Sequence, residues 1–124
     1  MSQKEEFLKV DYRSREVKMG IWVFGFKDND SHIAFVPSLN LTAYGATEKE
    51  AFDMLFEDVI QDFMKNILDI QESDVTKELN KYGWQRSRYF KKKFYNTPFI
   101  DKQGILKNFN LPDETPVKSM FEYA

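Results

Sequence analysis

The chain has 124 residues, among them 12 Phe, 6 Tyr and 2 Trp, and its formal net charge is −2. This length suits one domain with a sizeable core, which the aromatic residues should fill. The chain contains no cysteine, which excludes disulfides and thiolate metal sites. No apolar run approaches the roughly 20 residues that span a membrane, and the charged start is unlike a signal peptide. We therefore expect a cytoplasmic protein with no membrane segment.

Three ranges divide the domain. Residues 1–16 are polar and predict a partly ordered arm with room for a short strand. Residues 17–83 carry the alternating and helical apolar patterns of a folded core. Residues 84–124 open with basic and aromatic side chains and run on into a segment with three prolines, which predicts a mostly extended tail. A last short strand is expected within residues 105–111.

The first secure strand is predicted over residues 17–26. Its odd-numbered apolar residues fall on one face and its aromatic residues on the other: Met19, Ile21 and Val23 against Trp22, Phe24 and Phe26. A strand that is apolar on both faces must be covered on both. One helix covers only one face, so the other needs residues 84–95 or a second copy of the chain. We therefore expect a homodimer.

A hairpin turn at residues 27–31 leads to a second strand at residues 32–36 and a third that carries Leu39, Leu41 and Ala43. The main helix should begin at Thr47, because Thr47 followed by Glu50 forms a capping box. Its apolar stripe consists of Ala51, Phe52, Leu55, Phe56, Val59, Ile60, Phe63 and Ile67, with Phe56 and Phe63 expected to be buried against the sheet.

A second, shorter helix should begin at Ser73 or Asp74 and end at Gly83. Together the elements predict an α+β domain. Its antiparallel sheet has three or four strands, and the main helix packs across one face. The short helix and the extended C-terminal segment complete it.

Two motifs resemble those of HicB-type antitoxins. A strand that ends in Pro37-Ser38-Leu39 is followed by a helix that opens with Gly45-Ala46-Thr47-Glu48-Lys49-Glu50-Ala51. The strand at residues 19–26 and the turn at residues 27–31 fall where that family has them, so the resemblance covers roughly residues 18–63. It implies a degenerate RNase H-like fold and a non-catalytic protein that blocks a small, basic, mRNA-cleaving HicA-like toxin by direct contact.

The chain departs from that family in two places. Asn40 stands where the family commonly has glycine, and no pair of helices with a tight turn follows Gly83 to bind operator DNA. The predicted strands at residues 17–26 and 32–36 also lack the carboxylates that an active RNase H-type site would use to hold two metal ions.

Charge is distributed unevenly along the chain. Residues 47–74 hold nine acidic residues and two lysines. Four of these carboxylates lie outside the apolar stripe of the main helix and would face a basic partner: Glu50, Asp53, Glu57 and Asp58. An acidic helix face is also an ordinary solvated surface, and the resemblance favours the partner.

The opposite charge gathers in residues 84–95, where basic and aromatic side chains alternate irregularly. Strand, helix and loop all fit this stretch. An alternative function is a stand-alone single-stranded RNA-binding module, with Arg86, Arg88, Lys91, Lys92 and Lys93 on phosphates and Tyr89 and Phe90 stacking on bases. The simpler interpretation places the aromatic rings in the core, with the basic groups reaching solvent.

The residues for catalysis are few. His32 is the single histidine, and without cysteine no Cys/His set can form. Asp28 and Asp30 have ligand-like spacing, but Asp-Asn-Asp-Ser is ordinary hairpin chemistry and lacks the further oxygen ligands of a calcium loop. We expect no catalytic residue, no metal site and no cofactor.

Overall fold

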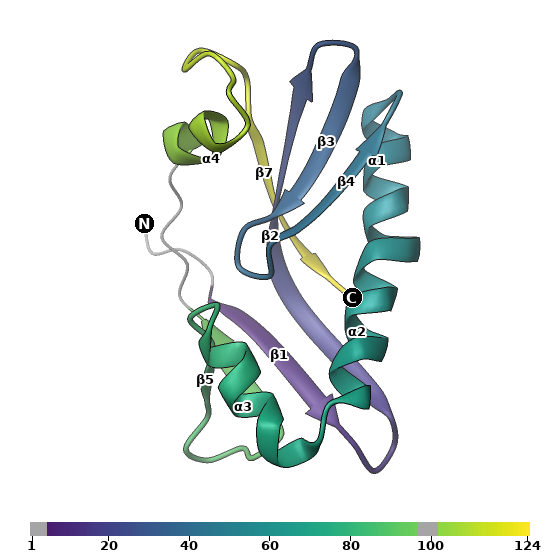
Figure 1. Cartoon of the computed structure of the whole chain (residues 1–124), viewed down its shortest axis with the longest axis vertical. Coiled ribbons are helices and arrows are strands. Elements are labelled where there is room, and N and C mark those ends of the chain that lie inside the picture. Colours follow the sequence, from purple (N-terminus) through teal and green to yellow (C-terminus); the bar gives the residue numbers. More distant parts are fainter. Residues whose placement is uncertain (1–4, 97–101) are drawn as a thin grey trace.

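The structure is a computed structural model that describes residues 5–96 and 102–124. These residues form a seven-stranded antiparallel sheet with helices against it (Figure 1). The strands are β1 (Glu6–Asp11), β2 (Glu16–Asp28), β3 (Ser31–Val36), β4 (Leu41–Gly45), β5 (Gln85–Arg86), β6 (Lys93–Asn96) and β7 (Lys118–Tyr123). The helical elements are α1 (Glu48–Met54), a π-helical turn (Leu55–Val59), α2 (Ile60–Asp69), α3 (Glu72–Asn80) and α4 (Lys102–Asn108). The α+β class predicted from the sequence is confirmed, with more strands than expected.

The sheet is organised around β2, a strand of 13 residues. β7 pairs with β2 from Gly20 to Gly25. β1 pairs with residues 16–20 and β3 with residues 24–28. Because Gly20 and Phe24 each pair with β7 as well, β1 and β3 must share the opposite edge of β2. The sheet thus has two halves joined by β2 (Figure 1): the β3–β4 half, and the β1–β6 half, which also holds β5.

The main helix, α1 to α2, begins where its sequence predicts. The Thr47 Oγ1 accepts a hydrogen bond from the Glu50 N–H at 3.1 Å, which satisfies one of the helix's unpaired donors. The Glu50 carboxylate accepts from the Ala46 N–H at 3.0 Å. The capped helix start is therefore confirmed, with the return bond one residue before the Thr47 N–H of a standard capping box.

A π-helical turn interrupts the main helix at residues 55–59. There the Ile60 N–H donates to the Leu55 carbonyl, five residues back instead of four. The extra residue shifts the buried stripe, so that Leu55 and Ile60 are fully buried while Phe56 and Phe63 are only half-buried. Phe56 and Phe63 pack against the core as expected but are not fully buried, because the prediction assumed uniform α-helical spacing.

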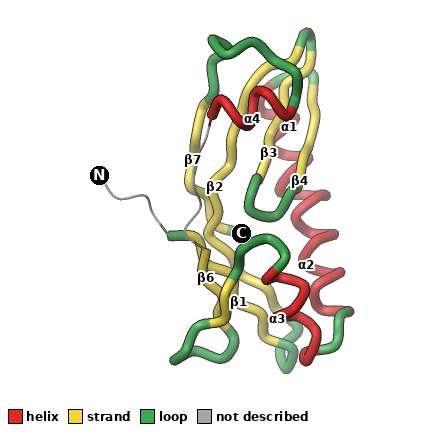
Figure 2. The backbone as a smooth tube through the Cα atoms, turned by 60° about the vertical axis from the view of Figure 1, so that its left-hand side comes forward, coloured by secondary structure: helices red, strands yellow, loops and turns green. Residues whose placement is uncertain are grey.

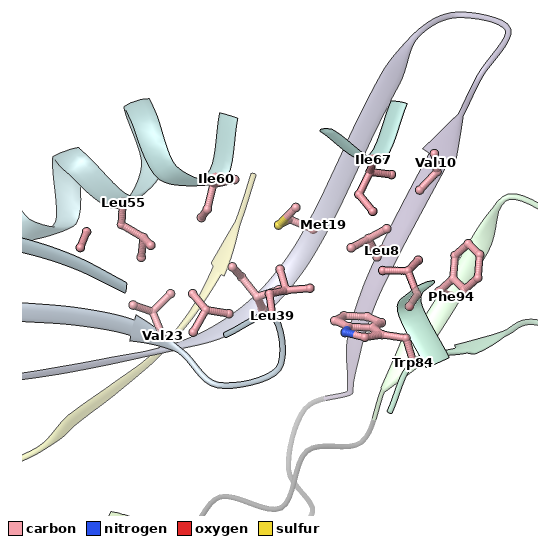
Figure 3. Packing of buried hydrophobic residues seen from close by; sticks show 14 of the residues in the cluster. Leu8, Val10, Met19, Val23, Leu39, Leu55, Ile60, Ile67, Trp84 and Phe94 are labelled. Atoms are coloured by element: carbon pink, nitrogen blue, oxygen red, sulfur yellow. The ribbon is translucent and has the colours of Figure 1, made fainter. Parts of the chain in front are cut away.

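Helices α1, α2 and α3 cover one face of the sheet, and the three β2 residues predicted to face the main helix are buried there: Met19, Ile21 and Val23. Trp84 enters the same core beside Leu8 and Phe94 (Figure 3). Its indole N–H donates to the Ser38 carbonyl at 3.0 Å, as a fully buried Trp requires. Trp84 therefore links the end of α3 to the turn between β3 and β4.

The other face of the β3–β4 half is covered by the C-terminal segment. Phe24 and Phe26 pack against Ile105 and Leu106 of α4, and the ring of Phe109 lies 5.1 Å from that of Phe26. We expected residues 84–95 or a second copy of the chain to cover these two phenylalanines, and that was wrong. The homodimer was expected because this face needed a cover, so the cover by α4 removes that reason for it.

The described part of residues 1–16 contains the short strand for which the prediction left room, whereas the tail differs from its prediction. The expected arm contributes β1, whose Leu8 and Val10 are buried and which pairs on both edges, with β2 and β6. Residues 105–111, expected as a strand, begin inside helix α4, and the last strand is β7 instead. Hydrophobic contacts with β2 order both segments, and such contacts are not visible in local sequence.

The second helix, α3, starts at Glu72, one or two residues before the predicted start, and ends at Asn80. Gly83 follows with φ of +90°, the left-handed conformation that favours glycine after a helix. No helix in residues 5–96 and 102–124 is both long enough and apolar enough to cross a membrane.

Candidate functional site

The candidate catalytic and metal residues are not brought together. Asp28 and Asp30 lie at the β2–β3 turn, where Asn29 adopts φ of +56° and closes the hairpin. His32 follows in β3, opposite Lys27. Within the described part of the chain, no group of three or more His, Cys, Asp or Glu side chains could hold a metal ion.

The four predicted partner-binding carboxylates lie on the main helix, and we call them the acidic helix surface: Glu50, Asp53, Glu57 and Asp58. Three are exposed and Asp53 is partly so. The exposed Asp62 of α2 extends this surface. The side chains that pack against the sheet, such as Leu55 and Ile60, occupy the other side of the helix.

The chain neutralises part of this acidic helix surface itself. Lys49 forms an ion pair with Asp53 at 2.6 Å, and that hydrogen bond raises the pKa of the Lys49 ammonium. The Glu50 carboxylate is used in the helix cap, and nearby Glu48 pairs with Lys118 of β7. Among the described residues, Glu57 and Asp58 form no ion pair. They are therefore the two carboxylates best placed to meet a cationic partner.

The predicted RNA-binding residues lie on a hairpin at the edge of the sheet, formed by β5, β6 and the loop between them. We call it the basic hairpin. Its loop is closed by the Ser87 hydroxyl, which accepts from the N–H groups of Tyr89 and Phe90, both at 3.2 Å. Lys92 leaves the loop to pair with Asp11 of β1 at 2.9 Å, which lowers the pKa of Asp11 to about 2.

The aromatic residues of this stretch divide into two groups. Trp84 and Phe94 are core residues, and the Arg86 guanidinium lies 5.2 Å from the centre of the Phe94 ring. In contrast, Tyr89 is 85% exposed and Phe90 is 57% exposed, with the Lys93 ammonium 5.1 Å from the Phe90 ring. The interpretation of these aromatics as core thus holds for Trp84 and Phe94, fails for Tyr89 and Phe90 in the loop, and holds only in part for the half-buried Tyr95 of β6.

Sequence reasoning missed a buried carboxylate at the junction of the two half-sheets. Glu6 is fully buried, and its Oε2 accepts from the Trp22 N–H at 2.8 Å and the Ser38 hydroxyl at 2.9 Å. Its Oε1 accepts from the Asn96 amide at 3.3 Å. Burial raises the pKa of the Glu6 carboxyl, and the three hydrogen bonds offset part of that rise. The sequence signal that could have revealed this burial is the spacing, because Glu6 alternates with Leu8 and Val10 and therefore shares their face of the strand.

This carboxylate occupies the gap between two strands. β1 and β3 share one edge of β2 but leave residues 21–23 unpaired on that edge. The Trp22 N–H faces the gap and finds a side-chain oxygen where a neighbouring strand would have offered a carbonyl. Glu6 is therefore a structural link between the halves. Comparisons of the chain with protein-family models, curated proteins and solved structures find no match.

Proposed function

We propose that this chain is a non-catalytic, HicB-like antitoxin of the cytoplasm that binds and neutralises a small, basic, RNA-cleaving HicA-like toxin. The observation that supports the proposal is the unit β2–β3–β4–α1, in which the strand, turn and Thr47-capped helix follow in the order that the resemblance implies. The acidic helix surface on that unit supplies the contact for a basic partner.

Glu57 and Asp58 carry most of this contact, because neither forms an ion pair with a described residue. Complementary charge acts mainly on the rate of encounter between two proteins. The double charge reversal Glu57→Lys with Asp58→Lys should therefore slow association with the toxin by about tenfold at low salt and flatten its salt dependence.

The test first asks whether a small basic protein is encoded beside the gene for this chain, and then measures its association with the purified chain by stopped-flow or surface plasmon resonance. A matched control reverses the same number of charges on the exposed C-terminal loop, with Asp113→Lys and Glu114→Lys. The control should associate like the parent. Absence of a complex with the basic partner, or equal effects of the two double variants, would refute the proposal.

A second candidate function is a stand-alone module for single-stranded RNA. It is favoured by the exposure of Tyr89 and Phe90 in a loop surrounded by Arg88, Lys91 and Lys93. Exposed rings among cations are the usual means of stacking bases and neutralising phosphates without reading sequence. Tight oligonucleotide binding with no affinity for a basic protein would favour this candidate over the antitoxin.

A further inference from the structure

The two faces of the β1–β6 half are covered differently. Helices α2 and α3 lie on the same side of β1 and β6, and helix α4 lies at the far end of the molecule against the β3–β4 half (Figure 2). Among the described residues, no helix covers the second face of the β1–β6 half. We call it the open sheet face.

Three lysines lie side by side across this open sheet face. Lys9 of β1 is directly opposite Lys18 of β2 on one edge and directly opposite Lys93 of β6 on the other. Directly paired residues point to the same face of a sheet, so the three lysine side chains start from a row across strands that together span about 10 Å. We call these residues the lysine row.

The lysine row lacks internal compensation. Like charges directly opposite each other destabilise a sheet, and none of the three lysines forms an ion pair with a described residue. The next pair on this face is Asp11 opposite Glu16; Asp11 already binds Lys92, so Glu16 is the one carboxylate of that pair left beside three lysines. The positive charge of the row is therefore available to an anionic ligand.

Aromatic rings flank the lysine row on the side of Gly20. Phe7 lies opposite Gly20 and Tyr95, and Tyr123 of β7 lies opposite Gly20 on its other edge. The absence of a side chain at position 20 makes room for the rings of Phe7 and Phe121: a Cβ there would lie 2.6 Å from an atom of Phe7 and 2.9 Å from an atom of Phe121. Tyr123 is 61% exposed, and its ring centre is 6.2 Å from that of Phe7.

From this arrangement we propose that the open sheet face is a platform for single-stranded RNA. The lysine row contacts phosphates, the rings of Phe7, Tyr95 and Tyr123 contact bases, and the loop of the basic hairpin extends the platform through Phe90. The inference rests on the second candidate function and assigns its binding surface mainly to residues outside the predicted stretch 84–95.

Charge complementarity selects this ligand. The acidic helix surface lies on the side of the sheet that carries the helices, and the lysine row lies on the other. A net charge of −2 therefore hides two surfaces of opposite sign. A single-stranded nucleic acid offers phosphates for the lysines and flat bases for the aromatic rings, the combination that single-strand binders use.

The test is a fluorescence anisotropy titration of the whole chain with a labelled oligouridine of about 12 nucleotides, within the usual site size. Titrations at about 50 mM and about 200 mM salt give the dependence of affinity on salt. Three double variants are compared: Lys9→Ala with Lys18→Ala on the platform, Arg88→Ala with Tyr89→Ala on the loop, and Lys27→Ala with Lys77→Ala as a control of equal charge away from both.

The platform variant should lose about tenfold or more in affinity at low salt. Its slope of log affinity against log salt should fall in magnitude by about 1.4, because each lost contact with a single-strand phosphate removes about 0.7. The double variant Lys9→Arg with Lys18→Arg should keep both the affinity and the salt slope of the parent. Tyr123→Leu should weaken binding by about fivefold or more through lost stacking and leave the slope unchanged. The control variant should match the parent.

The outcomes separate the platform from the function on which it rests. A folded parent chain with no affinity for the oligonucleotide refutes RNA binding and the platform together. RNA binding that is lost in the loop variant and unchanged in the platform variant supports the function and refutes the platform. Equal losses in the platform variant and the Lys27/Lys77 control refute a localised site. Tighter binding to vesicles of anionic lipid than to RNA overturns the choice of ligand.

Discussion

The two halves of the sheet share β2 but bury different numbers of faces. In the β3–β4 half, α1 covers one face and α4 with Phe109 covers the other, so Phe24 is 1% exposed. In the β1–β6 half, α2 and α3 cover one face, and the described residues leave Phe7 half-buried and Tyr123 exposed on the other.

This difference matches the chemistry of the side chains. The face covered by α4 presents phenylalanine and isoleucine, which gain free energy when water is excluded. The open sheet face presents lysines and aromatic rings, which can remain in water at lower cost. Coverage thus divides one continuous strand, β2, into a part with helices on both faces and a part on which the described residues place helices on one face only.

The largest expected effect comes from the same truncation in the two halves. Phe24→Ala should lower the free energy of unfolding by about 3–5 kcal/mol, because it opens a cavity in a fully buried site. Phe7→Ala should cost less than about 2 kcal/mol, because its ring is already partly in water. Urea denaturation followed by circular dichroism measures both. Equal losses would show that the open sheet face is as buried as its counterpart.

Glu6, at the junction of the halves, should give the next largest effect. Glu6→Leu removes the acceptor of the buried Trp22 N–H and should cost about 1–3 kcal/mol. Glu6→Gln keeps an acceptor oxygen and removes the charge. Glu6→Leu would also leave the Ser38 hydroxyl without its acceptor, because this hydroxyl donates to the same carboxylate oxygen. A Leu variant as stable as the parent would mean that the halves do not need this link.

The pH dependence of Glu6 has a defined sign. Its folded-state pKa lies above its usual value of 4.5, so between these two values the folded protein holds a proton that the unfolded chain has lost. Glu6 therefore disfavours folding at neutral pH, and this cost falls as pH drops towards 4.5. The stability of the parent relative to Glu6→Gln should rise over that range. A constant difference between the two proteins would contradict the raised pKa.

Sequence reasoning was accurate where the deciding interactions are local. The Thr47 cap, the turn at Asn29 and the alternation of Met19, Ile21 and Val23 each depend on neighbouring residues, and the structure confirms all three. The two charged segments were also correctly recognised from composition. Local chemistry was enough to place a helix start, a hairpin and a buried strand face.

The missed features depend on distant residues or on one inserted residue. β7 is ordered by pairing with β2, and helix α4 by packing against Phe24 and Phe26. The π-helical turn at Leu55 moves the buried stripe by one position, which no periodic pattern reveals. The lysine row exists only once β6 lies beside the β1–β2 hairpin, since Lys93 is distant in the chain from Lys9 and Lys18.

The smallest effect concerns the helices that cover the two halves. Thr47→Ala at the start of α1 should lower the free energy of unfolding by about 1 kcal/mol, because the Glu50 N–H loses its acceptor. Thr47→Ser should keep that bond. α3, which packs on the β1–β6 half, has Gln71 at its N-cap position without a side-chain cap hydrogen bond, so Gln71→Ala should be nearly neutral. Denaturation midpoints compare the three variants, and an equal loss for Thr47→Ala and Gln71→Ala would show that the cap is not what stabilises α1.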